Sequence, residues 1–355
     1  MEWDARRSND AARRARWMFI ADMPPGAPLV QLSRKEGKYS LIGLVRQRMR
    51  LRRLSPRTEK AYVAWIKRFA RFHGLRHPRL LGEKEVTEFL THLAVKERVS
   101  ASTQGQALAA LLFLYRHVIR DPLPWLNDVV RARRPARLPS VLTRDEVRFV
   151  LAEMRGVARL VALLLYGAGL RLTEALSLRV KDLDLERAVL TVRGGKGDRD
   201  RVSVLPRSAV APLTAHLAAV RRRHEWDVRA GAGSVVLPDA LARKLPAASR
   251  AWEWQWVFPA TRLYVDRETS ERRRHHLDAS VMQRAVGDAA RRAKLPKRVT
   301  CHTFRHSFAT HLLEDGYDIR TIQELLGHRD VRTTMVYTHV LNRGGRTVNS
   351  PADVL

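Results

Sequence analysis

A basic, proline-interrupted stretch divides this sequence and limits what the chain can fold into. Residues 131–139 read Arg-Ala-Arg-Arg-Pro-Ala-Arg-Leu-Pro, and each proline lacks the backbone donor that a helix interior or a central strand uses. Thr143 and Glu146 then have the spacing of a capping box, which marks the start of a new helix. A chain of 355 residues is long enough for two domains of ordinary size. We therefore predict a linker at 131–140 between two separately folded parts.

The part before the linker, residues 33–130, has helical patterning throughout. Ser55 followed by Pro56 predicts an N-cap with proline at the first helical position. One face of that helix carries four large apolar side chains, Tyr62, Trp65, Ile66 and Phe69. The four helices that we predict here cover residues 40–53, 57–72, 83–94 and 103–118.

The part after the linker, residues 141–355, mixes helices with one β-hairpin. A buried helix is expected around residues 160–166. Strands at 188–193 and 201–205 flank a Gly-Gly-Lys-Gly-Asp turn, and further helices follow. The predicted fold class is therefore mainly α with a small β-sheet, in a helical N-terminal domain and an α+β second domain. Residues 1–32 are Arg-rich and then Pro-rich, and we expect them to form a poorly ordered extension.

The charge of the chain predicts a polyanionic partner. Lys and Arg total 66 against 36 acidic residues, which gives a formal net charge of +30 and a pI near 11.4. Residues 34–71 alone hold thirteen basic and two acidic side chains. A solvated helix face is the usual interpretation of such a run, but this imbalance would be self-repelling without an anionic partner. Composition does not separate DNA from RNA, or an enzyme from a packaging protein.

Other features of the sequence indicate a cytoplasmic protein. The longest apolar run, residues 160–170, is shorter than the roughly 18 residues that a membrane span needs. The N-terminus has arginines but no apolar core followed by a cleavage site, so no secretion signal is predicted. The single cysteine, Cys301, excludes an internal disulfide and fits a reducing compartment. We expect a bacterial, nucleoid-associated protein with no membrane partner.

Polar side chains at two places in the second domain are candidates for chemistry. Arg171 stands at a predicted helix start, and Glu174 follows one turn later, where it can hold the guanidinium. Taken alone, this is an ordinary surface ion pair. Lys196 stands at the tip of the glycine-flanked hairpin, where taken alone it is an ordinary turn lysine.

Four more candidates lie near the C-terminus. His302 and Arg305 are three residues apart, on one face of a predicted helix. His328 follows Leu-Leu-Gly in a turn that ends a helix, where a histidine is often only a capping group. Tyr337 lies nine residues later, in a helix predicted from about Val331. Taken alone it is a half-buried tyrosine.

Together these side chains are the parts that phosphoryl transfer to a tyrosine requires. Arginines and a histidine can donate hydrogen bonds to the oxygens that carry charge in the transition state. A mobile lysine can protonate the leaving oxygen. A phenol is a poor nucleophile at pH 7 unless neighbouring cations stabilise the phenolate. Because no group of Asp, Glu and His stands at ligand spacing, we predict no metal and expect cationic side chains in its place.

Four segments resemble the tyrosine recombinase family in order and spacing. They are Ala168-Gly-Leu-Arg-Leu-Thr-Glu, Gly195-Lys-Gly, His302-Thr-Phe-Arg-His-Ser-Phe-Ala-Thr-His-Leu, and Leu326-Gly-His-Arg-Asp-Val-Arg-Thr-Thr-Met-Val-Tyr-Thr-His. The resemblance spans residues 38–355. It implies catalytic roles for Arg171, Lys196, His302, Arg305, His328 and Tyr337, with Tyr337 as the nucleophile.

The same resemblance implies an architecture and a reaction. The expected architecture is a two-domain, C-shaped clamp around DNA, in which a helical core-binding (SAM-like) domain precedes the catalytic domain. The expected reaction is site-specific recombination through a 3′-phosphotyrosyl intermediate and a Holliday junction, without a cofactor. The family exchanges its C-terminal segment within a DNA-bound tetramer, and Gly344 and Gly345 are a candidate hinge for that exchange. Because protomers with a charge of +30 repel one another, we expect a monomer in the absence of DNA.

A second, narrower resemblance is to integron integrases. It rests on the segments 237–246, 252–259, 274–276, 58–62 and 350–353, of which the first three form an insertion at about 237–276. It implies that Trp254, His275, His276 and Pro238 bind bases extruded from a folded single-stranded hairpin, besides a duplex attachment site. The plainer interpretation is that Trp252 and Trp256 lie on the core face of a strand. His275 and His276 are also candidate metal ligands, but no third ligand is evident.

Two other functions fit part of the sequence. A type IB topoisomerase uses the same tyrosine chemistry, but the aromatic insertion and the short segment after Tyr337 argue against it. A non-catalytic architectural DNA-binding protein would explain the charge. It would give no reason for Arg171, Arg305, His328 and Tyr337 to occur together in this order.

Overall fold

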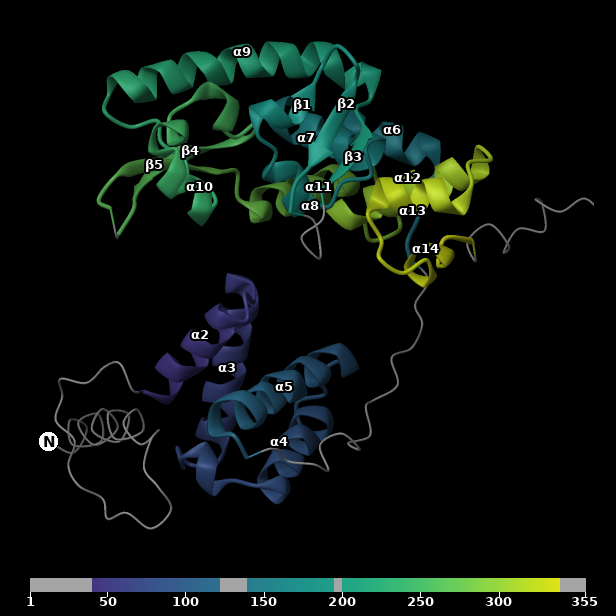
Figure 1. Ribbon diagram of the computed structural model, residues 1–355. Coiled ribbons are helices and arrows are strands. Elements are labelled where there is room, and N and C mark those ends of the chain that lie inside the picture. Colours follow the sequence, from purple (N-terminus) through teal and green to yellow (C-terminus); the bar gives the residue numbers. More distant parts are fainter. Residues whose placement is uncertain (1–39, 122–138, 195–199, 268, 339–355) are drawn as a thin grey trace, which may run out of the picture. The chain divides into compact units, whose positions relative to one another are not determined.

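The computed structural model describes residues 40–121, 139–194, 200–267 and 269–338. The chain divides into two compact units, residues 1–136 and 137–355, each with its own hydrophobic core (Figure 1). Four of the sequence predictions concern segments that lie wholly or mostly outside the described residues. These are the N-terminal extension, the linker at 131–140, the turn that carries Lys196, and the C-terminal tail.

The first unit is helical, and one of its helices begins at the N-cap that the sequence predicts. The Ser55 hydroxyl accepts a hydrogen bond from the Thr58 amide at 3.1 Å, and Pro56 opens the helix, so the predicted N-cap is confirmed. The predicted apolar face is also confirmed, because Trp65, Ile66 and Phe69 are buried and the half-buried Tyr62 packs on the same core. The elements are α2 (Leu41–Leu51), α3 (Pro56–Phe72), η1 (Pro78–Leu80), α4 (Glu83–Val95), α5 (Ala101–Leu114) and the π-helical turn η2 (Tyr115–Ile119).

The second unit begins with the predicted capping box and contains the predicted hairpin. The Thr143 hydroxyl accepts from the Glu146 amide at 3.2 Å, and the Glu146 carboxylate accepts from the Thr143 amide at 2.7 Å. The hairpin strands pair in antiparallel register, and a short strand that was not predicted extends the sheet to the order β1-β2-β3. The elements are α6 (Arg144–Ala152), α7 (Gly156–Gly167), α8 (Leu172–Leu176), η4 (Val180–Asp182), β1 (Leu183–Asp184), β2 (Val189–Val192), β3 (Arg201–Val204) and α9 (Arg207–Arg229).

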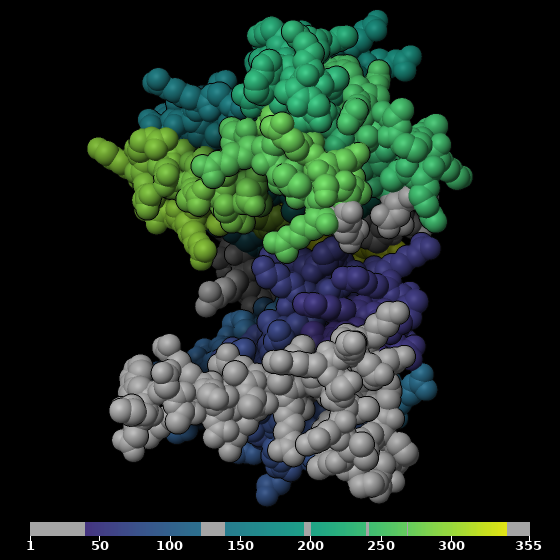
Figure 2. All heavy atoms as spheres, turned by 90° about the vertical axis from the view of Figure 1, so that its left-hand side faces the viewer, coloured from purple at the N-terminus to yellow at the C-terminus, as the bar shows by residue number. Residues whose placement is uncertain are grey.

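The insertion forms a small lobe with its own sheet, and four helices follow it. Strands β4 and β5 pair in antiparallel register, and the lobe lies at the surface of the second unit (Figure 2). The elements are α10 (Asp239–Lys244), η5 (Pro246–Ser249), η6 (Trp252–Trp254), β4 (Pro259–Val265), β5 (Arg272–His276), α11 (Ala279–Arg292), α12 (Cys301–Glu314), α13 (Ile319–Leu326) and α14 (Arg332–Met335).

Two local predictions were wrong. Trp252 lies in the short 3₁₀ helix η6 and not on a strand, although Trp256 is buried as the plainer interpretation expected. The last described helix ends at Met335, so Tyr337 lies in the turn after it and not within it. The predicted fold class holds, since the chain is mainly helical with two small sheets. No helix in the described part is long and apolar enough to cross a membrane.

Gly169 fixes the approach of α12 to the loop before α8. Its φ is +61°, and a Cβ atom at this position would lie 2.5 Å from the Phe308 ring and 3.2 Å from Leu326. An L side chain would therefore be strained in conformation and would also collide with the core. Gly156 has a similar φ of +55°, but a Cβ there would meet nothing within 4 Å.

We expect Gly169→Ala to destabilise the protein more than Gly156→Ala does. Both variants carry the conformational strain, but only the first also overpacks the core, which costs about 1–3 kcal/mol. Urea unfolding of the two full-length variants measures the difference. Equal losses of unfolding free energy would show that Phe308 moves aside and that the close approach is not required.

Candidate active site

The centre of the candidate site is a buried carboxylate surrounded by arginines. Glu174 on α8 is only 8% exposed, and its carboxylate accepts from Arg171 Nη1 at 2.7 Å and from the Arg171 amide at 2.9 Å. Arg201 donates to both carboxylate oxygens, at 2.6 and 3.1 Å, and Arg305 Nη1 lies 3.7 Å away. Burial tends to raise the pKa of Glu174, but hydrogen bonds from Arg201 and Arg171 outweigh it and lower the pKa to about 2. The predicted Arg171–Glu174 pair is therefore confirmed, as part of a larger cluster.

Arg201 was not among the site residues predicted from the sequence. This residue opens β3, and its Nε also donates to the Leu325 carbonyl at 2.9 Å, so it ties the sheet to α13. The available signal was the two-residue period of the strand. Ser203 is buried, and Arg201 lies on the same face two residues earlier.

Arg305 on α12 is fully buried and holds three segments together. Its guanidinium donates to the Gly169 carbonyl, to the Leu326 carbonyl at 2.6 Å and to His328 Nε2 at 3.1 Å. Burial and then the nearby Arg171 lower the pKa of Arg305 to about 9, so the group stays charged at neutral pH. The buried cation therefore lies against the loop before α8 and the turn after α13.

The contact with Arg305 determines the tautomer of His328. A guanidinium can only donate, so Nε2 accepts, and Nδ1 carries the proton that it donates to the Thr334 hydroxyl at 2.9 Å. Burial and then Arg305 lower the pKa of His328 to about 3, so the ring is neutral. Its predicted turn is confirmed, with Gly327 at φ +64° ending α13. In this arrangement Nε2 has no proton to give to a phosphate.

Tyr337 is buried beside a histidine that the sequence analysis did not single out. The Tyr337 side chain is 3% exposed, and its hydroxyl lies 3.0 Å from His306 Nδ1. The ring of His328 stacks near it, with centroids 6.5 Å apart. Burial raises the pKa of Tyr337, although Arg305 and Arg171 oppose the shift. The signal for His306 was its position four residues after His302, one helical turn along the same face.

His302 stands at the start of α12, and its side chain is exposed. Its ring meets that of His306 edge to face, with centroids 4.3 Å apart, and His306 in turn contacts the tyrosine. The structure therefore brings Arg171, Glu174, Arg305, His328 and Tyr337 together, whereas His302 lies at the edge. Lys196, the sixth predicted catalytic residue, is outside the described residues.

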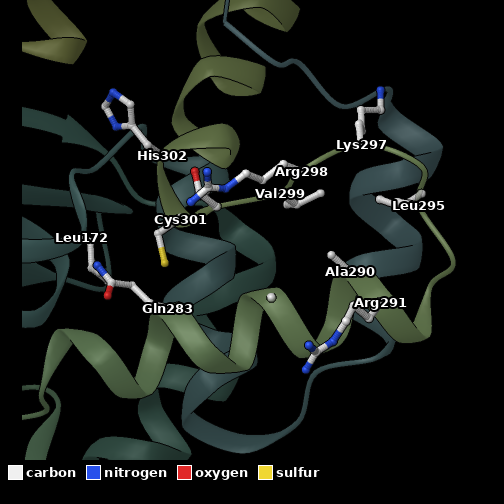
Figure 3. A pocket seen from close by; sticks show the side chains of 12 residues that line it. Leu172, Gln283, Ala290, Arg291, Leu295, Lys297, Arg298, Val299, Cys301 and His302 are labelled. Carbon is white, nitrogen blue, oxygen red and sulfur yellow. The ribbon is translucent and has the colours of Figure 1, made fainter. Parts of the chain in front are cut away.

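A basic cavity of about 700 Å³ opens beside His302 (Figure 3). Arg298 and Cys301 lie next to each other on one side of it, and Arg291 on α11 lies across from them. Cys301 is not a competing nucleophile, because burial raises the pKa of its thiol to about 11 and leaves it protonated. The positive charge of this hollow suits an anionic group next to the candidate site.

Arg179 and Lys181, which precede the insertion in the sequence, contact its tryptophans. Arg179 donates to the Trp254 carbonyl at 2.5 Å and to the Val236 carbonyl at 2.7 Å, and its guanidinium lies 3.8 Å from the centroid of the Trp256 ring. The Lys181 ammonium lies 3.2 Å from the centroid of the half-buried Trp254 ring. Trp256 belongs to the core of the lobe, whereas Trp254 is at its margin.

The predicted histidine pair ends β5 next to these tryptophans. The rings of His275 and His276 have centroids 4.0 Å apart, and His276 meets Trp256 edge to face at 5.3 Å. Arg274 anchors the strand through a buried pair with Asp227 on α9, with contacts of 2.7 and 2.8 Å. His275 is exposed. Pro238, the fourth predicted base-binding residue, is also exposed and precedes α10.

The described residues offer no metal site in this lobe or elsewhere. Among them, no three side chains of histidine, cysteine, aspartate or glutamate are grouped so that they could hold an ion.

Comparisons with known proteins give a consistent result. The profile described as "Phage integrase family" matches residues 140–343, and that of "Phage integrase, N-terminal SAM-like domain" matches residues 41–125. An "Integrase/recombinase" of Escherichia coli is 50% identical over 311 residues, which cover 88% of this chain and 92% of that protein. "Tyrosine recombinase XerD" of Mycobacterium leprae is 34% identical over 296 residues, which cover 78% and 83% of the two chains. The fold is similar to that of XerH site-specific recombinase, solved in a post-cleavage complex with palindromic difH substrate, with a TM-score of 0.56, 21% identity and coverage of 85% and 82%.

We expect Glu174→Gln to destabilise the protein by about 3–5 kcal/mol at neutral pH, because it leaves buried guanidinium groups without their counter-charge. The ordinary pKa of 4.5 falls to about 2 on folding, so the stabilisation due to the charge is fully present above about pH 4.5. It is lost as the pH falls through 2. Urea unfolding at several pH values should show the two proteins converging on the acid side, and a constant difference down to pH 3 would contradict this account.

Proposed function

The chain belongs to the phage integrase family of tyrosine recombinases, and we propose that it cleaves and rejoins DNA with Tyr337 as the nucleophile. The observation that supports this most directly is the position of the buried Tyr337 hydroxyl. It lies against His306, under the ring of the same His328 that Arg305 contacts, and its pKa responds to Arg305 and Arg171. Two arginines and a phenol are thus placed around one small volume.

The proposed cleavage step transfers one phosphoryl group. The Tyr337 phenol gives up its proton to a base in the site, its oxygen bonds to phosphorus, and the bond from phosphorus to the 5′ oxygen breaks, which leaves a 3′-phosphotyrosyl link. Arg171 and Arg305 stabilise the charge that develops on the non-bridging oxygens. Lys196 is proposed to protonate the leaving 5′ oxygen, and rejoining reverses every transfer. The step needs no metal or cofactor.

We propose that this conformation of the site precedes catalysis, because two of its features do not suit the reaction. The nucleophile is almost completely buried, and Nε2 of His328 accepts a hydrogen bond from Arg305 where a phosphate oxygen would need a donor. We propose that DNA binding exposes Tyr337 and that the phosphate takes over the Arg305 donor. His302, which is already exposed, is proposed to contact the same phosphate.

DNA is the proposed partner, held as in a clamp by both units. On α2, Arg46 and Arg50 are exposed, and the single carboxylate of Glu59 lies 3.5 and 3.3 Å from them, so the basic charge of this surface is not balanced. The XerH relative is solved with its difH substrate. We also propose that the chain is a monomer when free and a tetramer on DNA, in which neighbouring protomers exchange their C-terminal tails. The tail lies outside the described residues.

We propose further that the sites are those of integrons and include folded single-stranded hairpins. Trp254 would stack on an extruded base in the place where Lys181 now covers its ring, and the released ammonium would contact a phosphate. His275, His276 and Pro238 lie on the same lobe and would bound the extruded bases. A type IB topoisomerase remains the alternative enzyme, and an architectural protein the alternative without chemistry. Trapping of a covalent adduct on nicked DNA would exclude the architectural protein. Relaxation of a plasmid that lacks paired sites would favour the topoisomerase.

We expect Tyr337→Phe to bind DNA with unchanged affinity and to form no covalent complex, because only the nucleophilic oxygen is lost. Gel electrophoresis under denaturing conditions, with a nicked substrate that traps the adduct, measures this. Tyr317→Phe is the control, since Tyr317 is 54% exposed and is not part of the cluster. Adduct formation by Tyr337→Phe at the wild-type rate would transfer the role to another residue.

We expect Trp254→Ala to weaken binding to a bulged hairpin by roughly 1–3 kcal/mol, and to weaken binding to a fully paired duplex of the same length much less. Trp226→Ala, which removes an indole that is 63% exposed on α9, should affect neither. Binding curves for each variant on both DNA forms, at one salt concentration, measure the difference. Equal losses on hairpin and duplex would mean that Trp254 only supports the lobe.

A further inference from the structure

The Tyr337 hydroxyl has a specific neighbour that none of the predicted catalytic roles uses. His306 is the one hydrogen-bonding partner that the described part of the chain gives to this hydroxyl, with 3.0 Å between Oη and Nδ1. The rings lie 5.5 Å apart at 56°, so the imidazole meets the phenol at its oxygen and does not stack on its face. His302, one of the two histidines predicted to be catalytic, is exposed at the helix start and contacts His306 instead.

Burial determines the direction of this hydrogen bond. It raises the pKa of Tyr337, so the phenol keeps its proton at neutral pH. Burial, with His302 and Arg305 adding to it, lowers the pKa of His306 to about 4, so the imidazole is neutral and one of its nitrogens is an acceptor. A buried hydroxyl that keeps its proton needs an acceptor, and Nδ1 is the atom within reach.

On the basis of the function proposed above, we propose that His306 is the general base that takes the phenolic proton from Tyr337 during DNA cleavage. As the bond from the Tyr337 oxygen to phosphorus forms and the bond to the 5′ oxygen breaks, the phenolic proton moves to Nδ1 of His306. The 5′ oxygen receives a different proton, from Lys196. In rejoining, His306 returns its proton to the phenol oxygen as the phosphotyrosyl bond breaks.

The surroundings of His306 make the transfer a transient one. The charged and titratable groups that face it are His302 and Arg305 on α12 and Tyr337 after α14, and Arg171 faces the tyrosine. The arginines disfavour an imidazolium before DNA binds. The negative charge of the scissile phosphate offsets them, so the proton is held by His306 while the phosphorus is under attack.

The same helix supplies a matched control. His311 Nδ1 lies 2.8 Å from the hydroxyl of Tyr166, so α12 carries a second imidazole–phenol pair of nearly the same geometry. His311 is 5% exposed, and its pair takes no part in the proposed chemistry. Replacing His311 therefore controls for the loss of an imidazole–phenol hydrogen bond from α12 that does not involve the nucleophile.

The test is single-turnover cleavage by the full chain, measured on two nicked DNA substrates, a bulged hairpin and a duplex. We expect His306→Phe and His306→Asn to bind with wild-type affinity and to cleave roughly 10²–10⁴-fold more slowly, since asparagine keeps an acceptor but is not basic. His311→Phe should cleave within a few-fold of wild type. Cleavage by His306→Asn within tenfold of wild type would overturn the proposal and leave His306 a positioning residue.

Two rescue experiments identify which proton His306 moves and which proton Lys196 moves. Replacing Tyr337 by trifluorotyrosine gives a more acidic phenol that can lose its proton to water, so it should restore cleavage to His306→Phe and not to Lys196→Ala. A 5′-bridging phosphorothiolate, whose sulfur leaves without a proton, should restore Lys196→Ala and not His306→Phe. Failure of the fluorinated tyrosine to rescue His306→Phe would overturn the proposal. If the wild-type chain forms no adduct, the proposed function itself fails, which is a separate result.

Discussion

Glu174 holds together guanidinium groups that would otherwise repel one another. Arg171 and Arg201 donate to its carboxylate, and Arg305 lies 3.7 Å away. The three arginines come from the start of α8, from β3 and from α12, so one carboxylate joins segments that are far apart in the sequence. Removing the carboxylate would leave buried charge without compensation. Hydrogen bonds from Arg201 and Arg171 keep the pKa of Glu174 low.

The rest of the candidate site is arranged around the fixed cation Arg305. Its donors go to carbonyl oxygens on both sides and to His328, which sets the tautomer of that ring. His306, the next residue along α12, points to a different neighbour and contacts Tyr337. Adjacent residues on one helix therefore contact different neighbours, because successive side chains are turned by about 100° around the axis. In the proposed reaction, Arg305 stabilises charge and His306 accepts a proton.

The insertion is attached to this scaffold and is not independent of it. Arg179 follows α8 closely in the sequence, and it donates to carbonyls at both ends of the segment that precedes β4, those of Val236 and Trp254. The backbone at Val180 and Val257 adds further hydrogen bonds between the two regions. Hydrogen bonds thus connect the lobe to the segment that directly follows α8, the helix that carries Glu174. This linkage gives the base-binding proposal a structural route to the chemistry.

The sequence alone determined the parts that depend on local spacing. Capping residues, helical faces and the hairpin strands were predicted correctly, since each follows from residues within one or two turns. The pairing of Arg171 with Glu174 was equally local, at a separation of three residues. The length of the last helix was not predicted, because nothing in its sequence marks an end before Tyr337.

Only the tertiary structure decided which side chains meet. Arg201 reaches Glu174 across 27 residues, and His306 reaches Tyr337 across 31, distances over which no periodic pattern carries information. Burial likewise depends on packing of the whole unit, and burial sets the protonation of both His306 and Tyr337. The residue types needed for phosphoryl transfer are therefore written in the sequence. Their partners, protonation states and exposure are set by the fold, because those properties arise from contacts between distant segments.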